Sequence, residues 1–221
     1  MRTPCSCAAF LGIGVLLAAL SFPFLDSWLS TKAYTFRVPD LERIARSSLD
    51  SGLSLTTPSQ RMEHVLKELV HAYPGLIATD TDWIFLHSGG WMGAFKLLYA
   101  SLTEYVLLFG TAIPTDGHSG RYWANITDIL LTGQFRQWIE GEVEPIVHLP
   151  GASVPHPAWS VSGVQWEGGS WMLEHATGLI PSTLGFAFSD GIFSTQDIWS
   201  LGKAVAVYAR LVSKNLLAGR L

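Results

Sequence analysis

A hydrophobic segment opens the chain. No charged side chain occurs from Thr3 to Leu25, and residues 8–20 are almost wholly aliphatic. A run of this length is just sufficient to cross a bilayer as a helix. A cleaved signal peptide would use the same run, with cleavage near Ala19-Leu20-Ser21. We favour a retained anchor because only one basic residue, Arg2, precedes the run, and we predict that residues 1–33 form a single-pass transmembrane anchor.

Two apolar helices are predicted at the C-terminal end, over residues 179–221. The first covers Leu179 to Phe193, with Pro181 near its start. The second opens at Ser194 to Asp197, which has the spacing of a capping box. Apolar residues then recur at helical spacing beside a basic face: Ile198, Leu201, Val205, Tyr208 and Val212, with Lys203, Arg210 and Lys214. Such a helix either lies flat in a membrane interface, which we favour, or faces the core of a soluble bundle.

The central region, residues 34–178, is predicted to be the folded body. A helix is expected to begin at Thr57 to Gln60 and to end at Tyr73-Pro74-Gly75, and a shorter one to precede it over Asp40–Leu49. From Trp83 onward, β-rich runs alternate with Gly, Pro and Asp: Trp83–Leu86, Leu102–Phe109, Val143–Leu149, Val161–Trp166 and Ser170–His175. Short strands with regular turns predict a small barrel or sandwich, so the expected fold class is α+β.

Composition and charge narrow the class of protein. Hydrophobic residues make up 48% of the chain and charged residues 14%, and the mean hydropathy is +0.28. Such a chain is too apolar for disorder and too poor in charge for an ordinary soluble enzyme, whose charged share is about 25%. The net charge of −4 argues against a nucleic-acid partner. Cys5 and Cys7 both precede the body, which therefore has no disulfide framework.

Because charges are scarce, carboxylates inside apolar runs are candidates for chemistry. Glu104, Asp128 and Glu174 all have apolar neighbours. In a barrel interior, burial raises the pKa of a carboxyl group, and two groups at one site share a proton. Such a pair can act as acid and base or hold a cation. Each carboxylate could instead face solvent or pair with an arginine, and spacing alone does not bring Asp128 and Glu174 together.

Other candidate motifs are weaker. The chain has seven histidines, but none has the His-x-His or His-Glu-x-x-His spacing of metal ligands, so we predict no metal and no cofactor. No Gly-x-Ser-x-Gly motif supports a serine nucleophile. Gly89 and Gly93 have the spacing of a helix-packing motif, but they follow a strand-like run, which favours a tight turn. Asn125-Ile126-Thr127 is a glycosylation sequon whose apolar neighbours predict burial.

Several longer motifs resemble one known family. They are His87-Ser88-Gly89-Gly90-Trp91-Met92-Gly93-Ala94, Ala100 to Ala112, Gly117 to Ala124, Trp171 to Glu174, Ile180 to Leu184 and Phe193 to Asp197. In this order they resemble the sigma non-opioid intracellular receptors, a family that also includes the fungal C-8 sterol isomerases. The resemblance extends from about Tyr34 to the C-terminus. The segment before Tyr34 resembles the family only in its apolar character, not in its motifs.

The resemblance implies a cupin-like β-barrel behind one N-terminal transmembrane helix, closed by two C-terminal helices against the membrane, in a homotrimer or larger homo-oligomer. By position, Glu174 resembles the carboxylate that pairs with a ligand's protonated amine, Asp128 its hydrogen-bonded partner, and Tyr105 the residue that orients the glutamate. The pocket would be lined by Trp91, Phe109, Ile126, Trp166, Leu184 and Tyr208. Gly89, Gly90 and Gly93 resemble the stretch linked to oligomerisation.

The implied function is that of a membrane receptor rather than an enzyme. The resemblance places it in the endoplasmic reticulum membrane, the nuclear envelope and lipid droplets. It would bind hydrophobic amines, sterols or lipids, take part in lipid handling, and modulate ion channel and chaperone partners. The alternative is a C-8 sterol isomerase, in which Glu174 and Asp128 protonate and deprotonate a sterol at a double bond. The stretch from Gly117 to Ala124 favours the receptors, whereas Asn125 and His175 to Gly178 depart from them and leave ligand selectivity and pocket access open.

Overall fold

The computed structural model describes residues 20–50 and 52–221. The chain divides into two compact units, Met1–Ala33 and Tyr34–Leu221. In the first unit, residues 20–31 form a helix. The predicted transmembrane anchor lies for the most part outside the described residues. Over the part that is described, no helix combines the length and the apolar character needed to cross a membrane.

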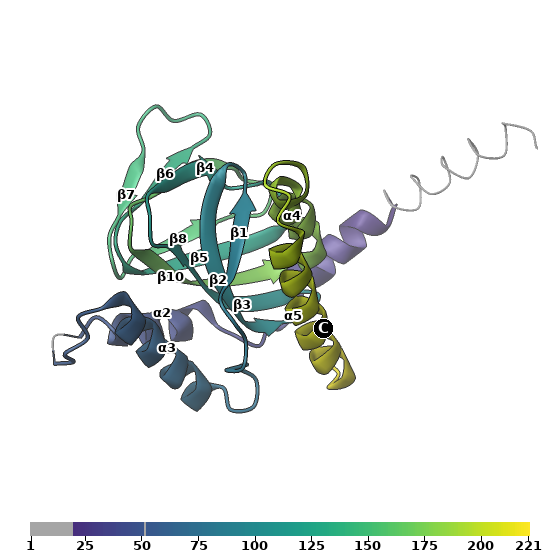
Figure 1. The fold of residues 1–221 in the computed structure, drawn as a ribbon. Helices are drawn as coiled ribbons and strands as arrows, with labels where there is room; N and C mark the ends of the chain where they lie inside the picture. The colour runs from purple at the N-terminus through teal and green to yellow at the C-terminus, as the bar shows by residue number, and fades with distance from the viewer. Residues whose placement is uncertain (1–19, 51) are drawn as a thin grey trace, which may run out of the picture. The chain divides into compact units, whose positions relative to one another are not determined.

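Two antiparallel sheets form the centre of the second unit (Figure 1). The larger sheet has the strand order β1-β2-β3-β10-β5-β8, and the smaller has β4-β9-β6-β7. Strands of the larger sheet are β1 (Ile84–Ser88), β2 (Trp91–Ala100), β3 (Glu104–Thr111), β10 (Ser170–Gly178), β5 (Ala124–Thr132) and β8 (Ser153–His156). Those of the smaller are β4 (Thr115–His118), β9 (Ser162–Trp166), β6 (Phe135–Ile139) and β7 (Ile146–His148). Phe109 and Met172 of the larger sheet share an apolar cluster with Phe135 and Trp166 of the smaller, so the predicted α+β sandwich or barrel is confirmed.

Side-chain alternation gives the larger sheet two different faces. In β10, Leu173 belongs to the cluster under the helices, whereas Met172 belongs to the cluster between the sheets. Because both faces are covered, β3 is buried along nearly its whole length and its sequence is almost continuously apolar. The pairing of β10 with β5 is regular apart from a register shift between Trp171 and Met172.

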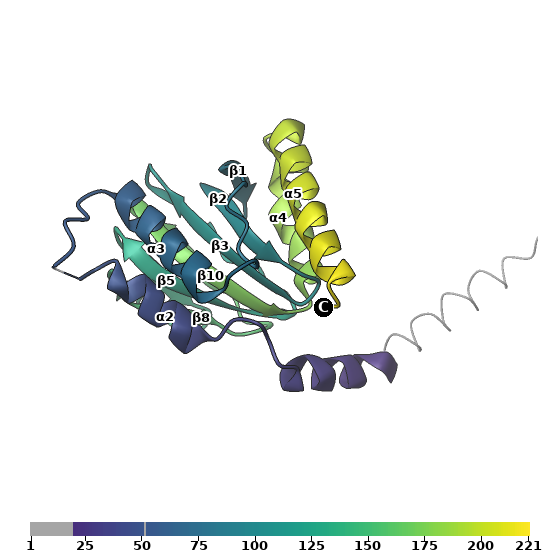
Figure 2. The same cartoon turned by 90° about the horizontal axis from the view of Figure 1, so that it is seen from below.

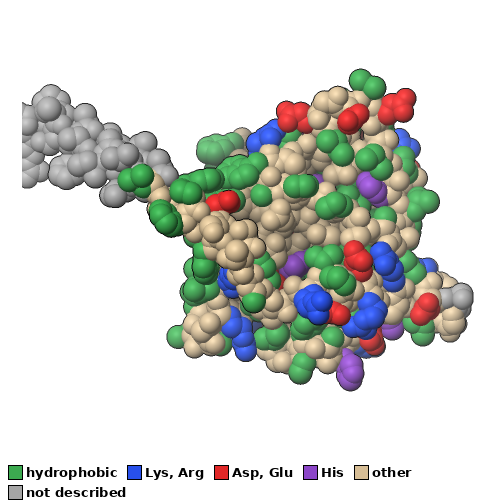
Figure 3. Space-filling view, turned by 180° about the vertical axis from the view of Figure 1, so that it is seen from behind, with side chains coloured by type: hydrophobic (Ala, Val, Ile, Leu, Met, Phe, Trp, Pro, Cys, Tyr) green, Lys and Arg blue, Asp and Glu red, His purple; other side chains and the backbone are tan. Residues whose placement is uncertain are grey.

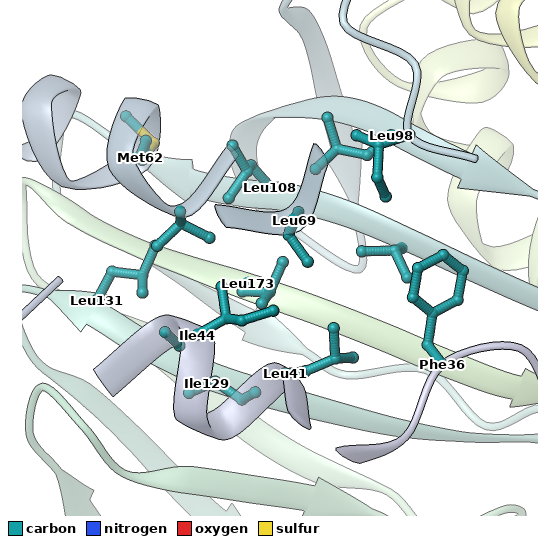
Figure 4. Packing of buried hydrophobic residues seen from close by; sticks show 14 of the residues in the cluster. Phe36, Leu41, Ile44, Met62, Leu69, Leu98, Leu108, Ile129, Leu131 and Leu173 are labelled. Carbon is teal, nitrogen blue, oxygen red and sulfur yellow. The ribbon is translucent and has the colours of Figure 1, made fainter. Parts of the chain in front are cut away.

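Two helices cover the outer face of the larger sheet, α2 (Val38–Ser47) and α3 (Pro58–Ala72) (Figure 2). As predicted, α3 begins within Thr57 to Gln60: Thr57 is the N-cap, and its side chain accepts from the Gln60 amide in a capping box. Leu41 and Leu69 are fully buried against Leu173 of the sheet (Figure 4). Burial of each such leucine stabilises the fold by about 2 kcal/mol, so this cluster fixes the helices to β3, β10 and β5.

The C-terminal region forms η1 (Ile180–Thr183), α4 (Leu184–Phe193) and α5 (Ile198–Leu217). The prediction that Ser194 caps the last helix is wrong, because Ser194 lies at the end of α4. The cap of α5 is Asp197, whose carboxylate accepts from the Ser200 amide at 3.0 Å. Between them, Gln196 adopts a φ of +55°, which interrupts the helical path.

The predicted apolar stripe of α5 is only partly buried. Val212 is 7% exposed, whereas Ile198 is 61% exposed. The buried half of α5 belongs to a cluster with Leu97 and Ala100 of β2. On the face shown in Figure 3, hydrophobic side chains are interspersed with acidic and basic ones, as on many protein surfaces.

Candidate functional site

A row of four polar side chains crosses the inner face of the larger sheet. Glu174 of β10 is the direct register partner of Asp128 of β5. Tyr105 of β3 is a diagonal neighbour of Glu174, and His156 of β8 is a diagonal neighbour of Asp128. Diagonal neighbours on one face of a sheet are within reach of long side chains. Strand register therefore assembles residues that lie far apart in the sequence.

Hydrogen bonds connect the members of this row. The Tyr105 hydroxyl donates to Glu174 Oε1 at 2.5 Å. Nε2 of His156 lies 3.1 Å from Asp128 Oδ2, and Gln137 Nε2 lies 3.4 Å from His156 Nδ1. Oδ1 of Asp128 is buried and has no hydrogen-bond partner among the described residues. This oxygen lies at the centre of the row, where the carboxyl group of Asp128 also interacts with that of Glu174.

The electrostatics of the row favour one bound proton. Burial raises the pKa of Glu174 well above 4.5, and the nearby charge of Asp128 raises it further, while the hydrogen bond from Tyr105 acts in the opposite direction. Burial, followed by the charge of Glu174, also raises the pKa of Tyr105, so its hydroxyl remains a donor. Two carboxyl groups at one site share a proton. A pair that shares one proton in this way carries one negative charge.

An apolar cavity lies over the row. The empty space of the cavity, including the part of its mouth that is open to solvent, is about 1070 Å³. The structure brings all the predicted ligand residues to this cavity: Trp91, Tyr105, Phe109, Ile126, Asp128, Trp166, Glu174, Leu184 and Tyr208. None of its lining residues within the described chain is a lysine or an arginine. That these residues bind a ligand remains a prediction.

Aromatic rings from both sheets and one C-terminal helix form the apolar walls of the cavity. The ring centre of Trp91 lies 5.2 Å from that of Phe109 and 5.5 Å from that of Trp166. Leu184 and Phe186 of α4 close the cavity beside them. The cavity is therefore largely hydrophobic, and its two carboxyl groups, Glu174 and Asp128, lie side by side on the larger sheet.

Three further residues that line the cavity were not predicted from the sequence: His156, Tyr122 and Phe186. The strand that carries His156 was missed because prolines at positions 155 and 157 read as loop signals. Phe186 lies in a continuous apolar run, in which periodicity does not distinguish the faces of the helix. A strand assigned over residues 153–156, with buried Val154 at its centre, would have revealed His156.

Glu104, the third embedded carboxylate, lies on the opposite face of the sheet. Its oxygens accept from the backbone amides of Thr35 and Phe36, both at 2.9 Å, and Oε1 lies 3.0 Å from His175 Nε2. The residue is 1% exposed. Glu104 thus does not face solvent and pairs with no arginine of the described chain, and it holds the start of the second unit against the sheet.

The glycine-rich segment forms the turn between β1 and β2. Gly89 and Gly90 have φ values of +56° and +90°, as a two-residue hairpin requires. At Gly93, a Cβ atom would lie 2.8 Å from the carbonyl oxygen of Gly110. The tight-turn interpretation is confirmed, whereas a role in oligomerisation remains a prediction.

The prediction that Asn125 is buried is wrong, because the alternation of β5 turns this side chain to the surface.

The row offers acid–base and ion-pairing chemistry. Over residues 20–50 and 52–221, no group of three or more histidine, cysteine, aspartate or glutamate side chains could hold a metal ion. The carboxyl pair can accept a cation, and its shared proton can pass to a substrate.

Comparison with known proteins identifies the family. Residues 12–220 match the family described as "ERG2 and Sigma1 receptor like protein". Sigma non-opioid intracellular receptor 1 of Taricha granulosa is 47% identical over 204 residues, which cover 91% of this chain and 88% of that protein. The receptor of Danio rerio is 44% identical over 194 residues, covering 87% and 85% of the two chains.

More distant similarities are of two kinds. C-8 sterol isomerase ERG2 of Gibberella zeae is 33% identical over 212 residues, covering 95% of this chain and 88% of the isomerase. Among solved structures, KdgF from Halomonas sp. matches with a TM-score of 0.40 and 16% identity over 47% of this chain and 94% of that chain. The matches to the receptors and the isomerase extend over almost the whole chain. The chain belongs to the ERG2 and Sigma1 receptor family, with greater identity to these receptors than to this isomerase.

Proposed function

We propose that this chain is a sigma-type receptor that binds hydrophobic amines through Glu174 and Asp128. The observation that carries the proposal is the register pair of carboxyl groups, Glu174 and Asp128, in an apolar cavity whose described lining includes no lysine or arginine. A protonated amine with apolar substituents would supply the cation and fill the hydrophobic space. Sterol- and lipid-like molecules fit the same apolar walls.

The chemistry of recognition follows from this geometry. An ammonium group that donates to a carboxylate in a medium of low dielectric makes a stronger hydrogen bond than in water. Tyr105 orients Glu174 for that contact through its 2.5 Å hydrogen bond. The faces of Trp91, Phe109 and Trp166 add cation–π attraction and apolar contact. The expected ligand is elongated, with its charge near the centre.

The proposed setting is the endoplasmic reticulum membrane, extending to the nuclear envelope and lipid droplets. Residues 1–33 would anchor the chain, residues 179–221 would lie against the bilayer, and a homotrimer or larger oligomer would modulate ion channel and chaperone partners. The names of the relatives as intracellular receptors support the location. Phe193 and Trp199, which are 84% and 76% exposed, support lipid contact.

Glu174→Gln tests amine binding directly. Its amide has the size of the carboxyl group but no charge, so affinity for a radiolabelled hydrophobic amine should fall about a hundredfold. Equilibrium binding to the purified full-length chain measures this loss. Glu144→Gln, which changes an exposed glutamate, is the matched control. Unchanged affinity of Glu174→Gln would overturn the proposal.

A C-8 sterol isomerase is the second candidate function. The shared proton of the carboxyl pair supports it, because one group could protonate a double bond while the other removes a proton. The test is sterol analysis of an isomerase-deficient fungal strain that expresses the native chain or Glu174→Gln. Δ7-sterols produced by the native chain alone would establish the enzyme. No conversion by a chain that binds amines would leave the receptor.

A further inference from the structure

His156 has no role in the proposed function, although it lines the cavity and contacts Asp128. Its side chain is 11% exposed. The amide nitrogen of Gln137 can only donate, so its contact with Nδ1 makes that ring nitrogen an acceptor. The ring proton of the neutral imidazole is then on Nε2, which donates to Asp128 Oδ2. The contact between Gln137 and Nδ1 thus makes Nε2 the ring nitrogen that donates to Asp128.

The titratable groups around His156 come from several elements. Asp128 of β5 is in direct contact, and Glu174 of β10 lies next to Asp128 in register. Burial lowers the pKa of His148 of β7 and the proximity of His156 lowers it further, while Asp128 acts in the opposite direction, so the net effect favours neutral His148. Burial and the two carboxyl groups raise the pKa of Tyr122, which therefore keeps its proton. The charge on this side of the cavity is set by Asp128, Glu174 and His156.

We propose that His156 is the positioning residue of the carboxyl pair and that its protonation makes the binding of cationic ligands pH-dependent. The neutral ring donates to Oδ2 of Asp128 and leaves Oδ1, which has no partner among the described residues, to receive the shared proton. Asp128 can then hold that proton when Glu174 ionises to pair with an amine. The inference rests on the proposed amine binding and concerns the regulation of that same site.

The sign of the pH dependence follows from counting charges. With His156 neutral, the row carries one negative charge, which matches one ammonium group. Protonation of His156 cancels that charge and places an imidazolium beside the site, so a cation binds less favourably. Histidine ordinarily changes its charge between about pH 5 and pH 8. Affinity for an amine that stays protonated throughout this range should therefore fall as the pH falls.

The test compares the native chain with His156→Gln, which keeps a donor near Asp128 but does not titrate. The dissociation constant of a hydrophobic tertiary amine is measured on the purified full-length chain. For the native chain, affinity should be roughly tenfold weaker at about pH 5.5 than at about pH 8. For His156→Gln, the two values should agree within about twofold. His71→Gln, which changes an exposed histidine of α3, should retain the native profile.

A ligand-free measurement separates this inference from the proposed function. The infrared carbonyl band of the protonated carboxyl group is followed as the pH is lowered, and His156→Gln should change its titration while His71→Gln should not. Identical titrations of the native chain and His156→Gln would overturn the inference, even if amines bind. A changed titration without amine binding would retain the coupling of His156 to the pair but overturn the proposed function and its pH regulation. His156→Asn replaces His156→Gln if the latter does not fold.

Discussion

Glu104, which is buried, and Glu174, which is half-buried at the cavity, lie in neighbouring strands, but the face on which each lies gives it a different use. Glu104 points toward the helices, where two backbone amides and His175 surround its oxygens. Glu174 points toward the cavity, where Tyr105 is its direct side-chain donor. Burial and the nearby charge of Asp128 raise the pKa of Glu174 and favour its protonated form. The sequence shows two similar glutamates, and only the register separates their roles.

The raised pKa of Glu174 predicts a pH-dependent stability. Below about pH 4.5 both folded and unfolded chains hold its proton, but as the pH rises toward the raised pKa only the folded chain retains it. The unfolding free energy should then fall by about 1.4 kcal/mol per pH unit across that window. Glu174→Gln has no carboxyl group at this position and should lack this fall in unfolding free energy. In urea unfolding, the variant should therefore gain stability relative to the native chain from pH 5 to pH 8. Parallel pH profiles for the two proteins would contradict the assignment.

Glu104→Gln should destabilise the fold without emptying the cavity. The amide keeps one acceptor oxygen but cannot accept from two backbone amides and His175 as the carboxylate does, at a cost of about 2–3 kcal/mol. Urea unfolding at neutral pH measures this cost, with Glu144→Gln as the surface control. Amine affinity of the folded variant should stay within about twofold, because Glu104 is not among the lining residues. A large loss of affinity would mean that the two faces of the sheet are coupled.

Among the elements, helices were easier to predict than strands. The capping box at Thr57 and the stop at Tyr73 to Gly75 place α3 within a residue of its observed bounds. Strands β2 and β5 were missed, although each runs for nine residues or more. Because both faces of the larger sheet are covered, these strands lack the polar–apolar alternation that marks a half-exposed strand. The error at Ser194 arose because Ser194 and Asp197 can both cap a helix, and the sequence does not show which of them does.

The turn between β1 and β2 should be highly sensitive to substitution. Gly89→Ala combines an unfavourable positive φ with a Cβ atom 2.5 Å from the carbonyl oxygen of His118, and should cost at least about 3 kcal/mol. Gly75→Ala has a similar φ of +76° but open space around the new atom, and should cost only about 1 kcal/mol. Thermal unfolding of both variants separates backbone strain from close packing. Equal losses would show that the contact with His118 relaxes without cost.

At the scale of the whole molecule, the cavity depends on segments from Leu86 to Tyr208. Hydrophobic patterning predicts that such a chain has a core, but it does not predict which positions of different strands meet. The ligand residues were predicted by family resemblance, because spacing alone left Glu174 and Asp128 unpaired. Register pairing, which depends on all the strands together, supplied the missing information.

A ligand that contacts so many segments should stabilise the entire second unit. At a hundred times its dissociation constant, a bound amine adds about 2.7 kcal/mol to the unfolding free energy. For a unit of this size, the midpoint of thermal unfolding should rise by roughly 5–10 °C. Differential scanning calorimetry of the native chain with increasing amine measures the shift, and Glu174→Gln should show little. A shift of equal size in both would indicate binding away from the carboxyl pair.

The irregular pairing of β10 with β5 determines where these strands can change in length. Between Trp171 and Met172 the register already shifts, so an inserted residue near that end could be absorbed by the bulge. From Met172 to Gly178 the ladder is regular, and one extra residue there would turn Glu174 toward the helices and bring an apolar neighbour into the cavity. Insertions and deletions are therefore expected to be tolerated at one end of β10 and excluded along the segment that pairs Glu174 with Asp128.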